Sequence, residues 1–165
     1  MEDLIFYTKL KADFFHHSIE FQRSQSRSPL ARTDADTTAF NQQRIQQLGA
    51  QAREALGLAC GLANDALPPS HPLRLHLALS VGHFLHRIMG ADDAAFETCN
   101  QAFREGMEEL NESAAAGDTE MFQEAAAALK QLTALMEELP AGEAAEDEEE
   151  ELVKRVKEVT ADLES

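Results

Sequence analysis

The sequence contains little of several residue types, and each shortage excludes a class of protein. Its two cysteines, Cys60 and Cys99, are too few for a disulfide framework. Both lie within helical patterns, so we expect reduced, buried thiols. No apolar stretch approaches the length of a membrane-spanning helix, and the N-terminal segment has no basic region followed by an apolar run. These absences predict a soluble chain located in the cytoplasm.

Positive charge is also scarce. The 165 residues include 14 Lys and Arg against 30 Asp and Glu, which gives a formal net charge of −16. Because such a surface repels phosphate backbones and anionic lipids, we expect neither nucleic acid nor membranes as partners. The charge is uneven, since residues 140–165 alone carry ten acidic and three basic side chains. The composition therefore predicts a moderately acidic helical domain over residues 1–139, followed by a strongly acidic tail over 140–165.

Motifs for catalysis are missing as well. The sequence has no glycine-rich phosphate loop, no HExxH or CxxC motif, and no nucleophile with a convincing general base. Its carboxylates cluster in polar segments and in the tail. We therefore expect no enzymatic activity, no cofactor and no bound metal.

The residues that are present predict an all-α protein, an antiparallel array of about five helices. Apolar residues make up 44% of the chain, which is enough for a core. They recur with a period near 3.6, and no segment alternates with period two. The helices are expected at residues 2–22, 39–66, 71–89, 92–113 and 118–139. The third is apolar on most sides and is expected to lie centrally.

Proline, glycine and N-cap residues set the expected helix ends. Pro68 and Pro69 stop the second helix, Ser70 is the expected N-cap of the third with Pro72 in its first turn, and Gly90 ends the third. In the first helix, the apolar spacing predicts a broad, aromatic-rich, core-facing stripe. Its members are Leu4, Ile5, Tyr7, Leu10, Phe14, Phe15, Ile19 and Phe21.

Two segments fall outside the helical pattern. Residues 23–38 are polar and predict a mobile loop. Within it, Ser26 follows Arg23 by three residues and Ser28 precedes a proline, so both serines are candidate phosphorylation sites. An unmodified loop is the alternative. A phosphate there would add up to about two negative charges.

The acidic tail has two parts. Residues 141–151 form a low-complexity acidic linker, which self-repulsion would extend. Four apolar residues then follow at spacings of 4, 3 and 4, namely Leu152, Val156, Val159 and Leu163. They predict a short amphipathic helix that either docks into a groove or stays solvated.

Two separated motifs resemble the 14-3-3 family. The run HPLRLHLALSVGHFLHRIMGADDAAFETCNQAFREGMEEL at residues 71–110 resembles a family helix beginning His-Pro-Ile-Arg-Leu and the Ala-rich helix after it. The segment FYTKLKADFFHH at residues 6–17 resembles Phe-Tyr-Leu-Lys-Met-Lys-Gly-Asp-Tyr-Tyr-Arg-Tyr. The resemblance covers residues 4–112 and implies the C-terminal half of the 14-3-3 fold, helices five to nine.

That placement implies that parts of the family fold have no counterpart in the sequence. The N-terminal helices of the family's dimer interface are absent, so we expect no family-type dimer interface. The third helix, which supplies a Lys and an Arg to the phosphate pocket, is absent too. Faces that these helices would cover, such as those of Phe6, Leu10 and Phe14, are expected to be exposed.

The resemblance also implies a ligand groove with altered chemistry. On the first helix, Lys9 is retained, whereas His16 and His17 stand where the family has an Arg-Tyr pair that grips phosphoserine. Arginine suits that task because its planar fork holds phosphate oxygens in pairs. An unperturbed imidazole is mostly uncharged at neutral pH. These substitutions predict a phosphate pocket that is largely degraded.

The third helix carries the other implied groove positions. Leu79 is retained, Ser80 replaces an Asn that binds the ligand backbone, and His83 replaces an apolar Val. A second ligand-binding Asn of the family aligns near Leu132. If His16, His17 and His83 face one groove, they form either a weak metal or pH-gated anion site, or a set that drifted after phosphate binding was lost.

The resemblance thus predicts a divergent adaptor that binds protein or peptide ligands, whether phosphorylated or not. The alternative is a structural or assembly subunit that buries its exposed helical face on a partner or on itself.

Overall fold

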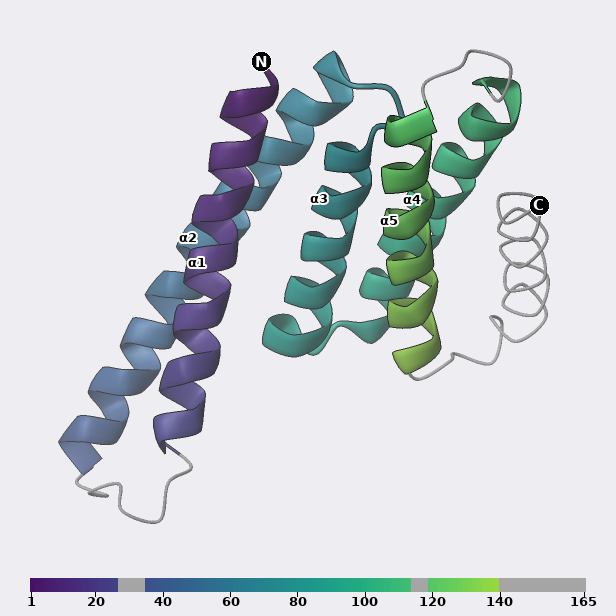
Figure 1. Ribbon diagram of the computed structural model, residues 1–165. Helices are drawn as coiled ribbons and strands as arrows, with labels where there is room; N and C mark the ends of the chain where they lie inside the picture. The colour runs from purple at the N-terminus through teal and green to yellow at the C-terminus, as the bar shows by residue number, and fades with distance from the viewer. Residues whose placement is uncertain (27–34, 114–118, 140–165) are drawn as a thin grey trace. The chain divides into compact units, whose positions relative to one another are not determined.

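The computed structural model describes residues 1–26, 35–113 and 119–139, and the elements within these ranges are helices (Figure 1). They are α1 (Glu2–Ser26), α2 (Ala35–Ala66), α3 (Pro72–His83), the π-helical segment η1 (Phe84–Met89), α4 (Asp92–Ser113) and α5 (Thr119–Glu138). The predicted all-α class is confirmed. Within the described ranges, no helix is both long and apolar enough to span a membrane.

The helix ends differ from the prediction at three places. The loop expected at residues 23–38 is wrong at both ends, because α1 continues to Ser26 and α2 begins at Ala35. Gln and Arg are good helix formers even where no apolar residue marks the period. The third helix turns into a π-helix at Phe84. Gly90 ends it as expected, in the left-handed conformation with φ 63°.

The predicted cap of α3 is also wrong. His71, not Ser70, is the N-cap, and its Nδ1 accepts a hydrogen bond from the Leu73 N–H at 3.2 Å. Pro72 follows in the first turn, where its missing N–H costs nothing. Ser70 instead donates its backbone N–H to Glu109 Oε2 at 2.7 Å. Histidine is an uncommon cap, so its sequence signal is weak.

The chain divides into two compact units, which we call unit 1 (Met1–Ala63) and unit 2 (from Asn64 onward). In unit 1, α1 and α2 lie side by side and run antiparallel (Figure 1). Its buried residues recur at spacings of three or four along each helix, apart from the adjacent Ala55 and Leu56, as expected for one packed face of a helix. They are Ile5, Thr8, Ala12, His16 and Ile19 of α1, and Ala52, Ala55, Leu56, Ala59 and Ala63 of α2.

The predicted core-facing stripe of α1 is therefore mostly wrong. Only its two isoleucines are buried, whereas Tyr7, Leu10, Phe14 and Phe21 are 52–67% exposed. The expectation drawn from the resemblance fares better, because Phe6 is also 50% exposed. A hydrophobic period identifies the apolar faces of a helix, but it does not say which of them finds a partner.

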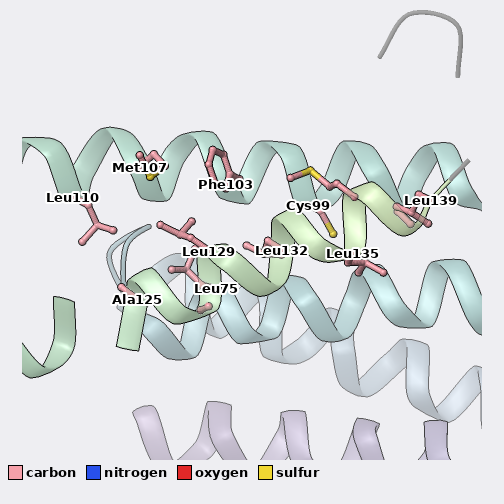
Figure 2. Packing of buried hydrophobic residues seen from close by; sticks show 13 residues of the cluster. Leu75, Cys99, Phe103, Met107, Leu110, Ala125, Leu129, Leu132, Leu135 and Leu139 are labelled. Carbon is pink, nitrogen blue, oxygen red and sulfur yellow. The ribbon is translucent and has the colours of Figure 1, made fainter. Parts of the chain in front are cut away.

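Unit 2 is a three-helix bundle with its own core. Thirteen buried residues form one cluster, and Figure 2 shows them between the helices. They come from α3, α4 and α5, with Leu139 just after the end of α5. Leu75 comes from α3, Cys99 and Phe103 from α4, and Leu129 and Leu132 from α5. The central position expected for the third helix stays a prediction, because within this unit each of α3, α4 and α5 contacts the other two.

Polar contacts join the start of α3 to α4. The Arg74 guanidinium donates to the Leu67 carbonyl at 3.0 Å and pairs with Glu105 Oε2 at 3.3 Å. At the other end of α3, His86 Nδ1 lies 2.7 Å from Asp92 Oδ1 and ties η1 to the first turn of α4. The loops at both ends of α3 are thus held to α4 by side chains.

Charge is distributed unequally between the two units. Unit 1 contains seven acidic and seven basic residues, so its formal charge is zero. Residues 64–139 contain thirteen acidic and four basic residues, and the tail adds a further −7. All of the excess negative charge therefore lies outside unit 1.

Candidate functional site

The candidate site on α1 begins with Lys9 and His16, which are seven residues apart and so share one face of the helix. Lys9 does not present a free ammonium group. Its Nζ lies 2.6 Å from Asp13 Oδ2, one turn later, and the two side chains are 19% and 27% exposed. This pair offsets the positive charge of the retained lysine.

The two histidines are engaged in the same way. His16 is only 9% exposed, and its Nε2 lies 3.5 Å from Glu20 Oε1. His17 is exposed, and its Nδ1 lies 3.4 Å from Glu20 Oε2. The two rings stack with centroids 5.8 Å apart. One carboxylate thus faces both imidazoles, and any positive charge they gain is met within the helix.

Carboxylates beside Lys9, His16 and His17 disfavour phosphate at these three residues. The paired groups are one ammonium group and the carboxylates of Asp13 and Glu20, with histidine counted as neutral at pH 7, while Arg23 adds a guanidinium seven residues after His16. A dianionic phosphate would be repelled by carboxylates that lie 2.6–3.5 Å from these nitrogens. The arrangement suits a neutral polar group, such as a peptide amide, better than a phosphate.

The second group of candidate residues lies on α3, in unit 2. Leu79, Ser80 and His83 are all half-buried, and His83 lies one turn after the other two. Leu79 packs against the bundle core, which leaves only part of its side chain for a ligand. The Ser80 carbonyl accepts the Phe84 N–H at the end of α3, so its backbone is part of the helix.

Other candidates have a structural role or lie outside the described residues. Leu132 is fully buried in the bundle (Figure 2), so that position offers a ligand no contact. The side chain of Ser26, together with Ser28 and the stripe Leu152, Val156, Val159 and Leu163, falls outside the described residues. Among the residues that are described, no group of three or more His, Cys, Asp or Glu could hold a metal ion. The metal interpretation of the histidines therefore gains no support.

The cysteines differ in their surroundings. Cys99 is fully buried in the bundle, and desolvation raises the pKa of its thiol from 9.0 to about 12. Cys60 on α2 is half-buried. Cys99 is confirmed as a buried thiol, and its chemistry is that of a packing residue rather than a nucleophile.

Unit 1 contains a hollow that was not predicted from the sequence. We call it the α1–α2 hollow, a depression of about 370 Å³ at the open side of the helix pair. It is lined by Phe14, Ser18, Phe21, Gln22 and Gln25 of α1 and by Asn41, Arg44 and Leu48 of α2. The spacing of seven between Phe14 and Phe21 indicates that they share one face of α1. Spacing alone does not show which residues of α2 lie opposite that face.

Comparison with known proteins identifies the family to which this chain is similar. The family described as 14-3-3 protein matches residues 1–135. Over 110 residues the chain is 32% identical to a 14-3-3-like protein of Fucus vesiculosus, covering 67% of this chain and 37% of that protein. It is 32% identical over 107 residues to 14-3-3-like protein GF14 chi of Arabidopsis thaliana, covering 65% and 33%. With 14-3-3-like protein 2 of Caenorhabditis elegans the identity is 29% over 110 residues, covering 67% and 37%. The chain thus spans about a third of the length of the curated relatives it matches.

Proposed function

Because the chain belongs to the 14-3-3 family, we propose that it is a protein-binding adaptor whose peptide ligands are bound without dependence on a phosphate. The proposal assigns ligand contacts to Lys9, His16 and His17 in unit 1, and to Ser80 and His83, with Leu79, in unit 2. It assigns the chain no catalytic activity and no cofactor.

The pairing of Lys9, His16 and His17 with carboxylates of the same helix supports this proposal. Each nitrogen that would face a phosphate has a carboxylate one turn or less away, at 2.6 Å for Lys9 and 3.4–3.5 Å for the histidines. A phosphate is held well where several unpaired donors converge on it, especially guanidinium groups. On α1 the paired donors instead favour neutral amide and carbonyl groups of a peptide backbone.

The test is a titration of the full chain with a phosphoserine peptide and its unphosphorylated twin at pH 7. We expect dissociation constants that agree within about fivefold, since a difference of less than about 1 kcal/mol in binding free energy changes the constant by less than about fivefold. A preference of a hundredfold or more for the phosphorylated peptide would contradict the proposal. It would indicate that the phosphate site still functions.

A variant sharpens this test. Glu20→Gln removes the carboxylate that faces both histidines, and we expect it to improve binding of the phosphorylated peptide while leaving the twin unchanged. Glu54→Gln, at an exposed position on α2, removes the same charge elsewhere and serves as the matched control. An equal effect of both variants would mean that only net charge matters.

A second candidate function rests on a different observation. Of the large apolar side chains that α1 exposes, Tyr7, Leu10, Phe14 and Phe21 lie on a face opposite its buried residues. Contiguous apolar surface of this kind marks an interaction site on most soluble domains. An assembly subunit that buries this face on another chain, or on a copy of itself, would account for it. Measuring the size of the purified chain in solution separates this function from that of a monomeric adaptor.

A further inference from the structure

The exposed apolar face of α1 has the spacing of a helix-packing seam. We call it the α1 stripe, formed by Tyr7, Leu10, Phe14 and Phe21, which are 65%, 52%, 67% and 64% exposed. The residues follow one another at intervals of 3, 4 and 7, the pattern by which one helix packs along another. It lies opposite the seam of Ile5, Ala12 and Ile19, which is already buried. The α1 helix therefore has two packing faces, and only one of them is used within unit 1.

The α1–α2 hollow borders this stripe, since Phe14 and Phe21 belong to both. Its lining combines apolar side chains with amide groups from Gln22, Gln25 and Asn41 and the guanidinium of Arg44. None of the described residues that line it carries a carboxylate, although the chain has 30 acidic residues. An aromatic ring with a polar edge matches this lining, because the ring would cover the phenylalanines and its hydroxyl would meet the amides.

We propose that a second copy of this chain occupies the α1 stripe and hollow, with the two α1 helices antiparallel about a two-fold axis near Phe14. In that arrangement Tyr7 of each copy lies against Phe21 of the other, because both are seven residues from Phe14. Tyr7 lies 11 residues before Ser18, about three helical turns, and 18 residues before Gln25, about five turns. Tyr7 therefore shares a side of α1 with both. It is therefore on the side of α1 that borders the hollow, and its ring enters the hollow of the partner.

This contact is self-complementary, as a two-fold interface must be. One helix supplies both the projecting residue, Tyr7, and the receiving surface around Phe21. Each copy therefore inserts a tyrosine and accepts one, and the interface closes at two chains. Tyrosine is also among the residues that contribute most to binding at interfaces.

Charge favours a copy of the chain over a strongly charged partner. Unit 1 has seven acidic and seven basic residues, so two copies of it meet without net repulsion. Contacts through residues 64–139, with thirteen acidic and four basic residues, would bring like charges together. The apolar stripe thus lies on the one unit whose net charge permits self-association.

The size of the stripe sets the strength of the dimer. An aromatic side chain buries about 150–250 Å² when fully covered. The four half- to two-thirds-exposed side chains can thus contribute roughly 400–500 Å² per copy. The total of roughly 800–1,000 Å² is below the range of about 1,200–2,000 Å² of stable interfaces and is typical of weak, transient ones. We therefore expect a reversible dimer with a dissociation constant on the order of micromolar.

The first experiment measures the mass of the full chain by sedimentation velocity over a concentration series. We expect a monomer–dimer equilibrium for the wild-type chain and a monomer for Phe14→Glu, which places two carboxylates at the two-fold axis. The control is Leu58→Glu, at a 57% exposed apolar position on α2, and it should dimerise like the wild-type chain. A wild-type chain that stays monomeric to about 100 µM, well above the expected constant, would overturn the proposal. A dimer that persists in Phe14→Glu would overturn it as well.

Engineered disulfides test the geometry itself. With Cys60 replaced by serine, Phe14→Cys should oxidise to a covalent dimer because the two-fold axis brings position 14 next to its copy. Tyr7→Cys mixed with Phe21→Cys should give a mixed dimer, while Leu58→Cys should not cross-link. Cys99 is buried and does not interfere. Cross-linking at Leu58 equal to that at Phe14 would contradict the antiparallel arrangement.

The inference rests on the second candidate function, that of an assembly subunit, and its failure can be told apart from the failure of that function. If the wild-type chain is monomeric but another protein binds in a manner abolished by Phe14→Glu, the assembly role stands and the self-association is wrong. The peptide titration is independent of both, because Phe14→Glu leaves Lys9, Ser80 and His83 in place.

Discussion

Gly82 of α3 lies against Cys99 of α4 and Leu135 of α5. A Cβ atom at this position would stand 2.6 Å from Cys99 Sγ and 2.9 Å from Leu135 Cδ2. Such distances are well inside van der Waals contact, so either the helices or the side chains must move apart. The absence of a side chain at residue 82 is thus what sets the spacing of α3 against α4 and α5.

We expect Gly82→Ala to lower the free energy of unfolding by about 1–3 kcal/mol, the usual cost of overpacking a core. The measurement is urea unfolding followed by circular dichroism. The matched control is Gly57→Ala in α2, where an added Cβ meets no atom within 4 Å. Because alanine is the better helix former, the control should raise stability by about 0.5–1 kcal/mol. Equal effects at both glycines would show that packing around Gly82 is loose.

Cys99 provides a second residue-scale prediction, on thiol reactivity. Burial raises the pKa of its thiol to about 12, and only the thiolate reacts with disulfide reagents. We expect Ellman's reagent at pH 8 to modify one thiol per folded chain, that of Cys60, and the second only after unfolding. Prompt modification of both thiols would contradict the closed bundle core.

The same shift makes stability depend on alkaline pH. The folded pKa of Cys99 exceeds the ordinary value of 9.0, so its contribution to stability is complete below pH 9 and is lost as the pH rises toward about 12. Unfolding free energies measured from pH 8 to 11 should fall with a slope that Cys99→Ala reduces. An unchanged slope in the variant would assign the pH dependence to other groups.

Among the helices, α3 depends on interactions at its two ends. Its first turn is capped by His71 and begins with Pro72, and its last turn widens into η1 before Gly90. The pairs Arg74–Glu105 and His86–Asp92 then hold the two ends to α4. This helix presents Leu79, Ser80 and His83, so its ends fix the position of half the candidate ligand contacts.

The cap of α3 can be tested directly. We expect His71→Ala to lower the free energy of unfolding by about 1 kcal/mol, because the Leu73 N–H loses its acceptor. His71→Asn should retain most of the stability, since asparagine is a strong N-cap. Urea midpoints of the three chains provide the measurement. A loss of equal size in both variants would mean that the imidazole stabilises the fold by packing rather than by capping.

At the scale of the whole molecule, the notable feature is the separation of charge. Unit 1 is neutral, whereas residues 64–139 carry thirteen acidic and four basic residues. Repulsion among like charges in unit 2 lowers its stability, and salt at 0.1 M largely screens this repulsion between charges more than about 10 Å apart.

We therefore expect the thermal midpoint to rise as NaCl increases from about 0.01 to 0.15 M, as the Debye length shortens. The variant Glu97→Gln/Glu108→Gln/Glu124→Gln, at three exposed positions of unit 2, should show a smaller rise. Lys11→Gln in unit 1 serves as the control and should respond like the wild-type chain. A flat response to salt in the wild-type chain would show that the carboxylates are too far apart to interact.

Much of the architecture could be predicted because it depends on local rules. Proline and glycine ended the second and third helices where expected, and the 3.6-residue period found five helical segments. The errors lie where a local rule had competitors. The polar ends of α1 and α2 carry no apolar period, and the cap is a histidine. The 14-3-3 family itself was identified from two motifs, and the match over residues 1–135 confirms it.

The candidate site could be predicted only in part. The identities of Lys9, His16 and His17 were readable by resemblance, but their pairing with Asp13 and Glu20 depends on rotamers that spacing does not determine. Their role as ligand contacts stays a prediction. The α1–α2 hollow was not predicted, because it depends on the register between two helices separated in the sequence.

The sequence by itself determined the helical class, the family, and the excess of negative charge, since each depends on residue identity and spacing along one chain. The tertiary structure decided which apolar faces are buried. Only packing against a second helix distinguishes the buried Ile5–Ala12–Ile19 seam of α1 from the exposed stripe of Tyr7, Leu10, Phe14 and Phe21. The division into two units also showed where positive charge is scarce. Unit 1 is neutral, and the excess negative charge lies from residue 64 onward.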